Sequence, residues 1–167
     1  MLSVANFGHF WRRDRVIFGK PGKGNSGSLE GFFGSLRNPT RVEFRDQIGV
    51  YVLFASSREV VYVGQAGAGA QRLLSRLRSH TRDHLRDRWE YFSWFGLRQH
   101  NKDGNLSEKQ KPDSKFSGSN SDALDEMEAV LIQLFEPRLN KQGSKWKESQ
   151  EFRQWDEGLD PADEEGE

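Results

Sequence analysis

Two short apolar segments, separated by a polar turn, constrain the fold of this chain most strongly. Residues 48–55 and 60–63 are rich in β-branched and aromatic side chains, and residues 56–59 between them are polar. This pattern is typical of a β-hairpin that is mostly buried. Residues 89–95 alternate large rings with smaller groups, which predicts a third strand that ends at Gly96.

Helical segments are expected between and after these strands. Residues 71–86 are rich in Leu and Arg and contain no Pro or Gly, so they predict a helix. A second helix is expected over 123–136, with Pro137 as its stop signal. A shorter helix is expected around 145–155. The order of these elements predicts an α/β (α+β) fold, in which a small three-stranded, mainly antiparallel sheet is flanked by helices.

The remaining segments define the expected domain organisation. A chain of 167 residues suits one domain. Residues 1–46 are interpreted as an N-terminal extension, and the dense glycines from Gly19 to Gly34 predict a loop. The main domain covers 47–155, with a polar insertion at 98–120, and an acidic tail follows at 156–167.

The composition excludes several classes of protein. The chain has no cysteine, which excludes disulfides, iron–sulfur clusters and thiolate zinc sites. No apolar run approaches the ~20 residues that a membrane helix needs. The first residues do not resemble a secretory signal, so we expect a cytoplasmic protein without a membrane partner.

The charge of the chain is distributed unevenly. Seven carboxylates and no basic residues lie in 156–167, so 18 acidic and 25 basic side chains remain in 1–155, a net charge of +7. This asymmetry fits a body that binds phosphate and equally fits ordinary surface charge with a solvating tail.

The helix expected at 71–86 carries one polar ridge. Arg72, Arg76, His80 and His84 recur every four residues, while Leu73, Leu74 and Leu77 lie on the other side and are expected to pack on the sheet. Arginine beside histidine suits the binding of a phosphate group. Taken alone, however, the ridge is more simply a solvated basic face with Asp83 and Asp87 as partial counterions.

The helix expected at 123–136 places a carboxylate beside its apolar side. Four apolar residues form one stripe, and Glu128 lies on the flank of that stripe. A carboxylate there needs a cation or hydrogen-bond donors. The spacing leaves open whether Glu128 binds a metal or forms an ion pair with an arginine of the first helix.

Six separated elements lie in order along residues 48–141. They are Gly49-Val50-Tyr51, Val61-Tyr62-Val63-Gly64, Arg76, His80, Glu128 and Asn140. Together they resemble the GIY-YIG endonuclease superfamily and are most similar to its type II restriction endonuclease branch. The first two resemble the paired motif that names the family, with valine in place of isoleucine in both.

The resemblance implies a divalent-metal-dependent endonuclease that hydrolyses DNA phosphodiester bonds. Tyr51 would help to deprotonate the attacking water, provided that Arg76 or the metal lowers its pKa, and Arg76 would donate to the phosphate oxygens. Tyr62 and His80 would orient water or relay a proton. Glu128 would bind one Mg²⁺ or Mn²⁺ ion, and Asn140 would fix the geometry by hydrogen bonds.

The implied partner is double-stranded DNA, and a homodimer is possible because duplex sites are two-fold symmetric. The side chains expected to contact DNA are Arg72, Arg78, His84, Lys102, Lys109 and Lys111. The insertion also offers His100 and neighbouring amides for reading base edges. The alternatives are a catalytically inert nucleic-acid-binding module, and a nuclease of repair or of a mobile element.

Overall fold

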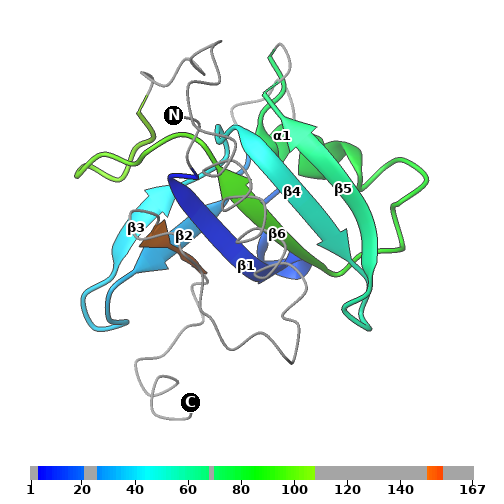
Figure 1. Cartoon of the computed structure of the whole chain (residues 1–167), viewed down its shortest axis with the longest axis horizontal. Helices are drawn as coiled ribbons and strands as arrows, with labels where there is room; N and C mark the ends of the chain where they lie inside the picture. Colours follow the sequence, from blue (N-terminus) through cyan, green and yellow to red (C-terminus); the bar gives the residue numbers. More distant parts are fainter. Residues whose placement is uncertain (1–3, 21–25, 68–69, 108–149, 156–167) are drawn as a thin grey trace, which may run out of the picture.

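The described residues of the chain form two β-sheets and one α-helix (Figure 1). The computed structural model describes residues 4–20, 26–67, 70–107 and 150–155. Its elements, in chain order, are β1 (Asn6–Arg12), the 3₁₀ turn η1 (Arg13–Arg15), β2 (Glu30–Phe33), β3 (Thr40–Glu43), β4 (Gly49–Phe54), β5 (Val60–Ala66), α1 (Leu73–Ser79), β6 (Tyr91–Gly96), β7 (Gln150–Glu151) and β8 (Arg153–Gln154).

The larger sheet has the strand order β5-β4-β6-β1-β7. Its centre consists of the predicted hairpin and the predicted third strand, because β4 pairs antiparallel with both β5 and β6. The hairpin and the strand at 89–95 are therefore confirmed. In this register Tyr51 lies opposite Gly64 on one side and opposite Trp94 on the other.

The expectation of a three-stranded sheet is wrong, because the sheet continues beyond β6. Strand β1 pairs antiparallel with β6, and β7 pairs in parallel with β1. Phe7 and Trp11 of β1 are buried. Their burial explains why β6 gains a partner from residues 1–46, the segment interpreted as an extension: the strand covers its edge and adds aromatic surface to the core.

A second sheet has the strand order β3-β2-β8. The expectation of a loop over Gly19–Gly34 is therefore wrong for residues 30–33, which form strand β2. The physical reason is clearest at Gly31. A Cβ atom at this position would lie 2.7 Å from the Trp11 ring, so the glycine makes room for a buried tryptophan. Glycine density here reflects close packing as well as turns.

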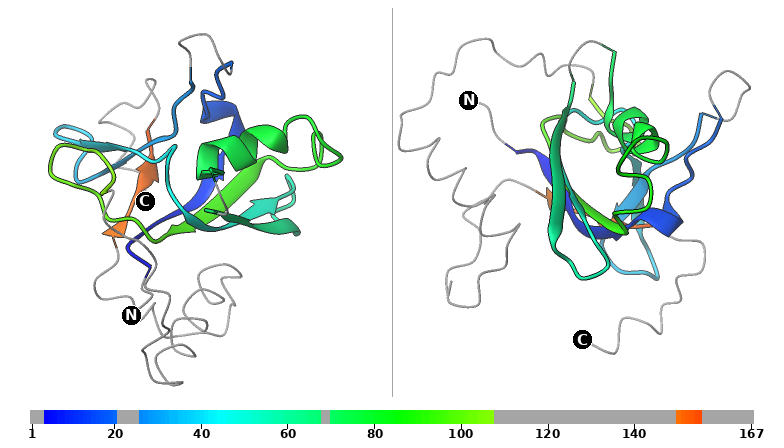
Figure 2. Two further views of the ribbon diagram at one scale, coloured as in Figure 1. Left: turned by 90° about the horizontal axis from the view of Figure 1, so that it is seen from above. Right: turned by 90° about the vertical axis from the view of Figure 1, so that its right-hand side faces the viewer.

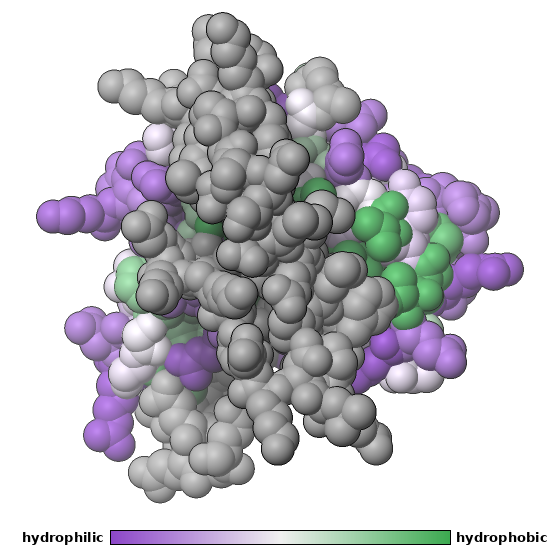
Figure 3. Space-filling view, viewed as in Figure 1, coloured by the Kyte–Doolittle hydropathy of each residue, from purple (hydrophilic) through white to green (hydrophobic). Residues whose placement is uncertain are grey.

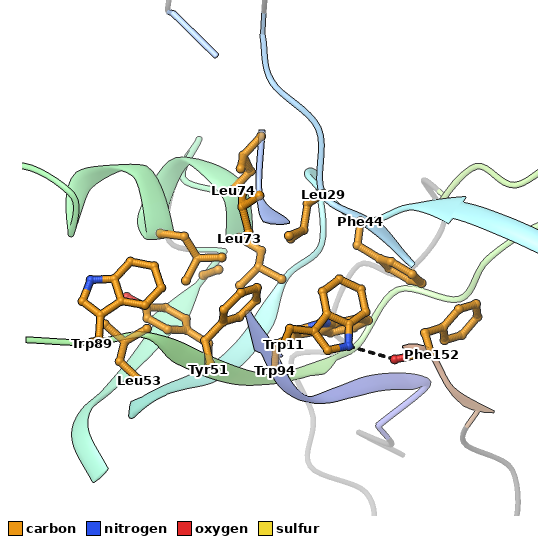
Figure 4. Packing of buried hydrophobic residues seen from close by; sticks show 14 of the residues in the cluster. Trp11, Leu29, Phe44, Tyr51, Leu53, Leu73, Leu74, Trp89, Trp94 and Phe152 are labelled. Carbon is orange, nitrogen blue, oxygen red and sulfur yellow. Dashed lines mark hydrogen bonds between the residues drawn. The ribbon is translucent and has the colours of Figure 1, made fainter. Parts of the chain in front are cut away.

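The helix expected around 145–155 is wrong over residues 150–154, which are extended (residues 145–149 lie outside the described part). Phe152 is fully buried between β7 and β8, and its N–H donates to Phe7 O at 2.9 Å. The Trp11 indole donates to Phe152 O, also at 2.9 Å (Figure 4). Pairing with β1 and β2 through β7 and β8 satisfies the backbone here, so tertiary contacts override local helix preference.

Helix α1 lies on one face of the larger sheet (Figure 2). Leu73, Leu74 and Leu77 are buried in the core, as expected from their spacing. The helix is shorter than the predicted 71–86, however, and a series of turns follows His80. Asp83 accounts for this early end, because its carboxylate accepts the Leu85 N–H at 2.8 Å and so competes with helical hydrogen bonding. The helix expected at 123–136 lies outside the described residues.

The same face of the larger sheet carries the main core. One buried cluster contains residues of α1 and of both sheets, together with Phe152, and part of it is drawn in Figure 4. Apolar surface also reaches solvent along the β4–β5 side of the molecule (Figure 3), where Val50, Val60 and Val63 are exposed. None of the helices in the described residues is long and apolar enough to span a membrane.

One buried residue, Gln47, joins the start of α1 to the end of β6: its side-chain amide contacts Arg98 and its backbone contacts Leu73. Gln47 Oε1 accepts the Arg98 N–H at 2.9 Å, and Gln47 Nε2 donates to Arg98 O at 3.0 Å. Its own carbonyl oxygen accepts the Leu73 N–H at 3.0 Å. Gly96 permits this contact, since a Cβ there would lie 2.3 Å from the Gln47 side chain.

Gln47→Leu is expected to lower the free energy of unfolding by roughly 2–4 kcal/mol, because it removes the acceptor of the Arg98 and Ile48 N–H groups and one of two donors to Arg98 O. Urea unfolding of the variant and the wild type measures the difference. Gln65→Leu, at an exposed strand position, is the control and should change the stability by less than about 0.5 kcal/mol. Equal stability of the two variants would contradict the role of this amide.

Candidate active site

Tyr51 lies at the centre of the candidate site. It belongs to the middle strand of the larger sheet and has 0% of its surface exposed. Its side chain lies in the core among residues of the sheet and of α1 (Figure 4). A buried hydroxyl needs hydrogen-bond partners. Two residues supply them: His80 Nε2 lies 2.8 Å from the Tyr51 hydroxyl, and Arg76 Nε donates to the same oxygen at 3.3 Å.

Arg76 reaches Tyr51 from α1. Its Nη1 also donates to Gln71 Oε1 at 3.2 Å, so two side chains orient the guanidinium. The hydrogen bond with Tyr51 raises the pKa of Arg76 further above its already high value, against a smaller effect of desolvation. The guanidinium is therefore a fixed positive charge beside the phenol.

Arg76 acts on the pKa of Tyr51 in the expected direction, but it does not set the net shift. Burial of the phenol raises its pKa and is the largest influence, while the hydrogen bond and the charge of Arg76 lower it. In the free protein, Tyr51 is thus protonated at neutral pH. Its proton must move to a neighbouring base before Tyr51 can accept one from water.

His80 is placed to be that base. It follows the last residue of α1 and is only 4% exposed, so the interpretation of a solvated ridge is wrong at this position. The ridge ends here because the helix ends at Ser79, and the ring turns towards the sheet. Its ring centroid lies 4.8 Å from that of Tyr62 of β5.

Asp83 completes the site, and its role was not foreseen from the sequence beyond that of a partial counterion. His80 Nδ1 lies 2.6 Å from Asp83 Oδ2. Desolvation would raise the pKa of Asp83, but hydrogen bonds from the Leu85 N–H and from His80 together lower it. The spacing of three residues between His80 and Asp83 was a usable signal, since such pairs meet on a helical turn.

The glycine of the second motif has a steric role at this site. Gly64 lies opposite Tyr51 in the β4–β5 register. A Cβ atom on Gly64 would lie 2.4 Å from the Tyr51 hydroxyl oxygen. Only glycine allows the phenol to pass this close to the neighbouring strand, towards Arg76 and His80.

The residues expected to contact DNA have different surroundings. Arg78 donates to Phe18 O at 2.6 Å and also to Ser26 O, so it holds the N-terminal segment instead of facing a ligand. His84 and Lys102 are exposed, and Arg72 is half-buried at the start of α1. The remaining residues expected at the site or at DNA lie outside the described part of the chain: Lys109, Lys111, Glu128 and Asn140.

His100, expected to read base edges, is instead part of the packing. Its ring lies against Phe33 and Phe152, with centroid distances of 5.3 and 5.0 Å. Its Nδ1 lies 3.1 Å from Asn6 Oδ1, and burial lowers its pKa. The start of the insertion therefore joins the two sheets, and only its later residues stay candidates for DNA contact.

The described part of the site supplies hydrogen-bond donors and a proton acceptor more readily than a metal cage. No three His, Asp or Glu side chains in the described ranges lie close enough together to hold an ion. Within the described part of the chain, the carboxylate that contacts His80 is that of Asp83, and its two oxygens are engaged by His80 and Leu85.

Gly64→Ala is expected to displace Tyr51 or its strand and to cost about 1–3 kcal/mol of stability, because the added methyl group overlaps the phenol oxygen. Urea unfolding measures the cost. Ultraviolet titration of the tyrosines, against Tyr51→Phe, detects the change at the hydroxyl. Gln65→Ala, on the next and exposed residue of β5, is the control. Wild-type stability of Gly64→Ala would show that the close approach is unimportant.

Comparison of the chain with protein-family models, with curated proteins and with solved structures found no match.

Proposed function

We propose that this protein is a divalent-metal-dependent DNA endonuclease of the GIY-YIG type, and that it acts as a restriction enzyme. One observation carries the proposal: the Tyr51 hydroxyl lies within hydrogen-bond distance of both Arg76 and His80. Arg76 and His80 belong to another motif than Tyr51 and follow it by 25 and 29 residues in the sequence. A buried hydroxyl needs a hydrogen-bond partner, but burial alone does not require both an arginine and a histidine.

The arrangement suits hydrolysis of a phosphodiester. That reaction needs a water that loses its proton and a positive charge beside the phosphate oxygens in the transition state. Tyr51 and His80 provide a route for the proton, from the phenol to Nε2. Arg76 provides the charge. This residue is partly exposed, so a phosphate can approach its guanidinium.

The proposal includes one Mg²⁺ or Mn²⁺ ion, held through Glu128. In the described site, Asp83 is engaged by His80, which leaves Tyr51 and Tyr62 as oxygen groups and no spare carboxylate. A hard cation with mostly water ligands needs at least one more acidic group, and Glu128 is the residue that the sequence offers. When bound, the ion would supply charge to the phosphate and favour ionisation of water.

A second candidate function is a nucleic-acid-binding domain without activity. The burial of Tyr51 and His80 favours it, because the same hydrogen-bonded chain would also stabilise a core that never meets water. The two functions differ in one simple experiment. Incubation with mixed duplex DNA and Mg²⁺, followed by mapping of the ends, gives discrete ends for a restriction enzyme and random nicks for a less specific nuclease. An inert module leaves the DNA intact but bound.

Glu128→Ala is expected to abolish cleavage and to retain most of the affinity for duplex DNA, since one lost carboxylate removes the metal but not the basic surface. Chelation of Mg²⁺ with EDTA should have the same effect on the wild type. Glu126→Ala is the matched control, because a helix over 123–136 would place this side chain on another side from Glu128. Cleavage by Glu128→Ala at the wild-type rate would rule out this residue as the metal ligand.

Arg76→Ala is expected to lower the single-turnover rate at saturating DNA by roughly 10²–10³-fold, the typical loss when a fixed donor to a developing charge is removed. Arg72 lies one helical turn earlier, and the contact with Tyr51 is made by Arg76. Arg72→Ala should therefore mainly weaken the binding of DNA. Rates measured over a series of DNA concentrations separate the two effects. The reverse ranking would assign the role of Arg76 to Arg72.

A further inference from the structure

Asp83, His80 and Tyr51 form a continuous hydrogen-bonded chain. Asp83 Oδ2 lies 2.6 Å from His80 Nδ1, and His80 Nε2 lies 2.8 Å from the Tyr51 hydroxyl. The other Asp83 oxygen accepts the Leu85 N–H at 2.8 Å, which fixes the carboxylate in the turn after α1. Both ring nitrogens of His80 are thus engaged, one by an acid and one by a phenol.

We propose that Asp83 is the positioning residue of this site: its carboxylate holds His80 in the tautomer with hydrogen on Nδ1, so that Nε2 accepts the proton of Tyr51. Its catalytic consequence rests on the proposed nuclease function. The tautomer itself does not, because it is a property of the free protein.

The geometry favours this tautomer strongly. With the hydrogen on Nε2, an unprotonated Nδ1 would face a carboxylate oxygen at 2.6 Å, and two acceptors at that distance repel each other. The hydrogen bonds of Asp83 lower its pKa, so the carboxylate is ionised near neutral pH.

The other titratable groups that face His80 among the described residues do not oppose the arrangement. Tyr62 of β5 lies beside the ring, with the two centroids 4.8 Å apart, and also raises the pKa of both Tyr51 and Arg76. Tyr51 receives a hydrogen bond from Arg76 and has its own proton to donate to Nε2. Tyr51 and His80 thus each accept one hydrogen bond and donate one.

The proton step that follows is simple. The O–H bond of Tyr51 breaks as an N–H bond forms on His80 Nε2. The products are a phenolate beside the Arg76 guanidinium and an imidazolium beside the Asp83 carboxylate. Each new charge has an opposite charge within hydrogen-bond distance, which lowers the cost of separating them inside the core.

The first experiment measures the tautomer of His80 by long-range ¹H–¹⁵N correlation on the full chain, with the signals assigned by comparison with His80→Gln. The wild type is expected to carry hydrogen on Nδ1 and none on Nε2 when the ring is neutral. A wild-type ring with its hydrogen on Nε2 would overturn the proposal, and this measurement needs no variant of Asp83.

Asp83→Asn keeps an oxygen for the Leu85 N–H and presents an amide N–H to His80 Nδ1. The tautomer is therefore expected to change to hydrogen on Nε2, which can no longer accept from Tyr51. Asp87→Asn is the matched control, because Asp87 lies in the same turn, is 88% exposed and makes only a long contact with Arg86 at 3.7 Å. The proposal fails if Asp83→Asn leaves the His80 signals unchanged.

Cleavage gives the second readout. In Asp83→Asn the single-turnover rate is expected to fall on the order of 10²–10⁴-fold, as expected when a catalytic histidine is held in the wrong tautomer. A wild-type rate in Asp83→Asn would contradict the positioning role. If the wild type itself cleaves no DNA, the nuclease proposal fails, while the tautomer measurement still decides the role of Asp83.

Discussion

The site depends on one requirement, that the hydroxyl of a fully buried tyrosine must be hydrogen-bonded. Tyr51 lies in the middle strand of the larger sheet, so strands on both sides occupy its backbone and only its side chain is free to choose partners. Gly64 opens the space for the phenol, and α1 brings Arg76 over it. The helix then ends at Ser79, which lets His80 turn inward to the same oxygen. The glycine of the second motif thus gives this oxygen room, and the arginine and the histidine supply its hydrogen bonds.

The rest of the fold holds the strand that carries Tyr51. Strand β6 would be an edge of the sheet, but β1 covers it, and β7 in turn covers β1. Residues from the two ends of the described chain meet there: the Trp11 indole donates to Phe152 O, and the Phe152 N–H donates to Phe7 O. An internal strand bound on both sides has little freedom to shift its register. A site built on such a strand keeps its donors and acceptors in place without DNA, which is the condition for electrostatic preorganisation.

The parts of this structure that the sequence predicted are those with local, periodic signals. The hairpin around Tyr51, the strand before Gly96 and the leucine face of α1 all repeat with the period of their element. The wrong predictions share a different cause. Strand β2 was not predicted because it lies among dense glycines, one of which, Gly31, makes room for Trp11. The strands around Phe152 were not predicted because their partners lie more than 100 residues away. The same holds for single residues: the sequence suggested Arg76 and His80, but only the folded turn shows that Asp83 bonds to His80 and that Arg78 bonds to Phe18 O.

Burial gives Tyr51 and His80 fixed positions and at the same time opposes their ionisation. Desolvation raises the pKa of Tyr51, so in the free protein the phenol keeps its proton and is not available to accept one. In the chain of Asp83, His80, Tyr51 and Arg76, a negative group lies at one end, a positive group at the other, and two groups that can carry the proton lie between them. The charges alternate along the chain once the proton has moved from Tyr51 to His80. When the proton moves to His80, no net charge is created inside the core, and each ion gains a partner that is already at hydrogen-bond distance. An isolated tyrosine at the same depth would have to create an unpaired phenolate, at a cost of several kcal/mol. The alternation of charges is therefore what makes a buried phenol usable, and the carboxylate of Asp83 is the member that sets its direction.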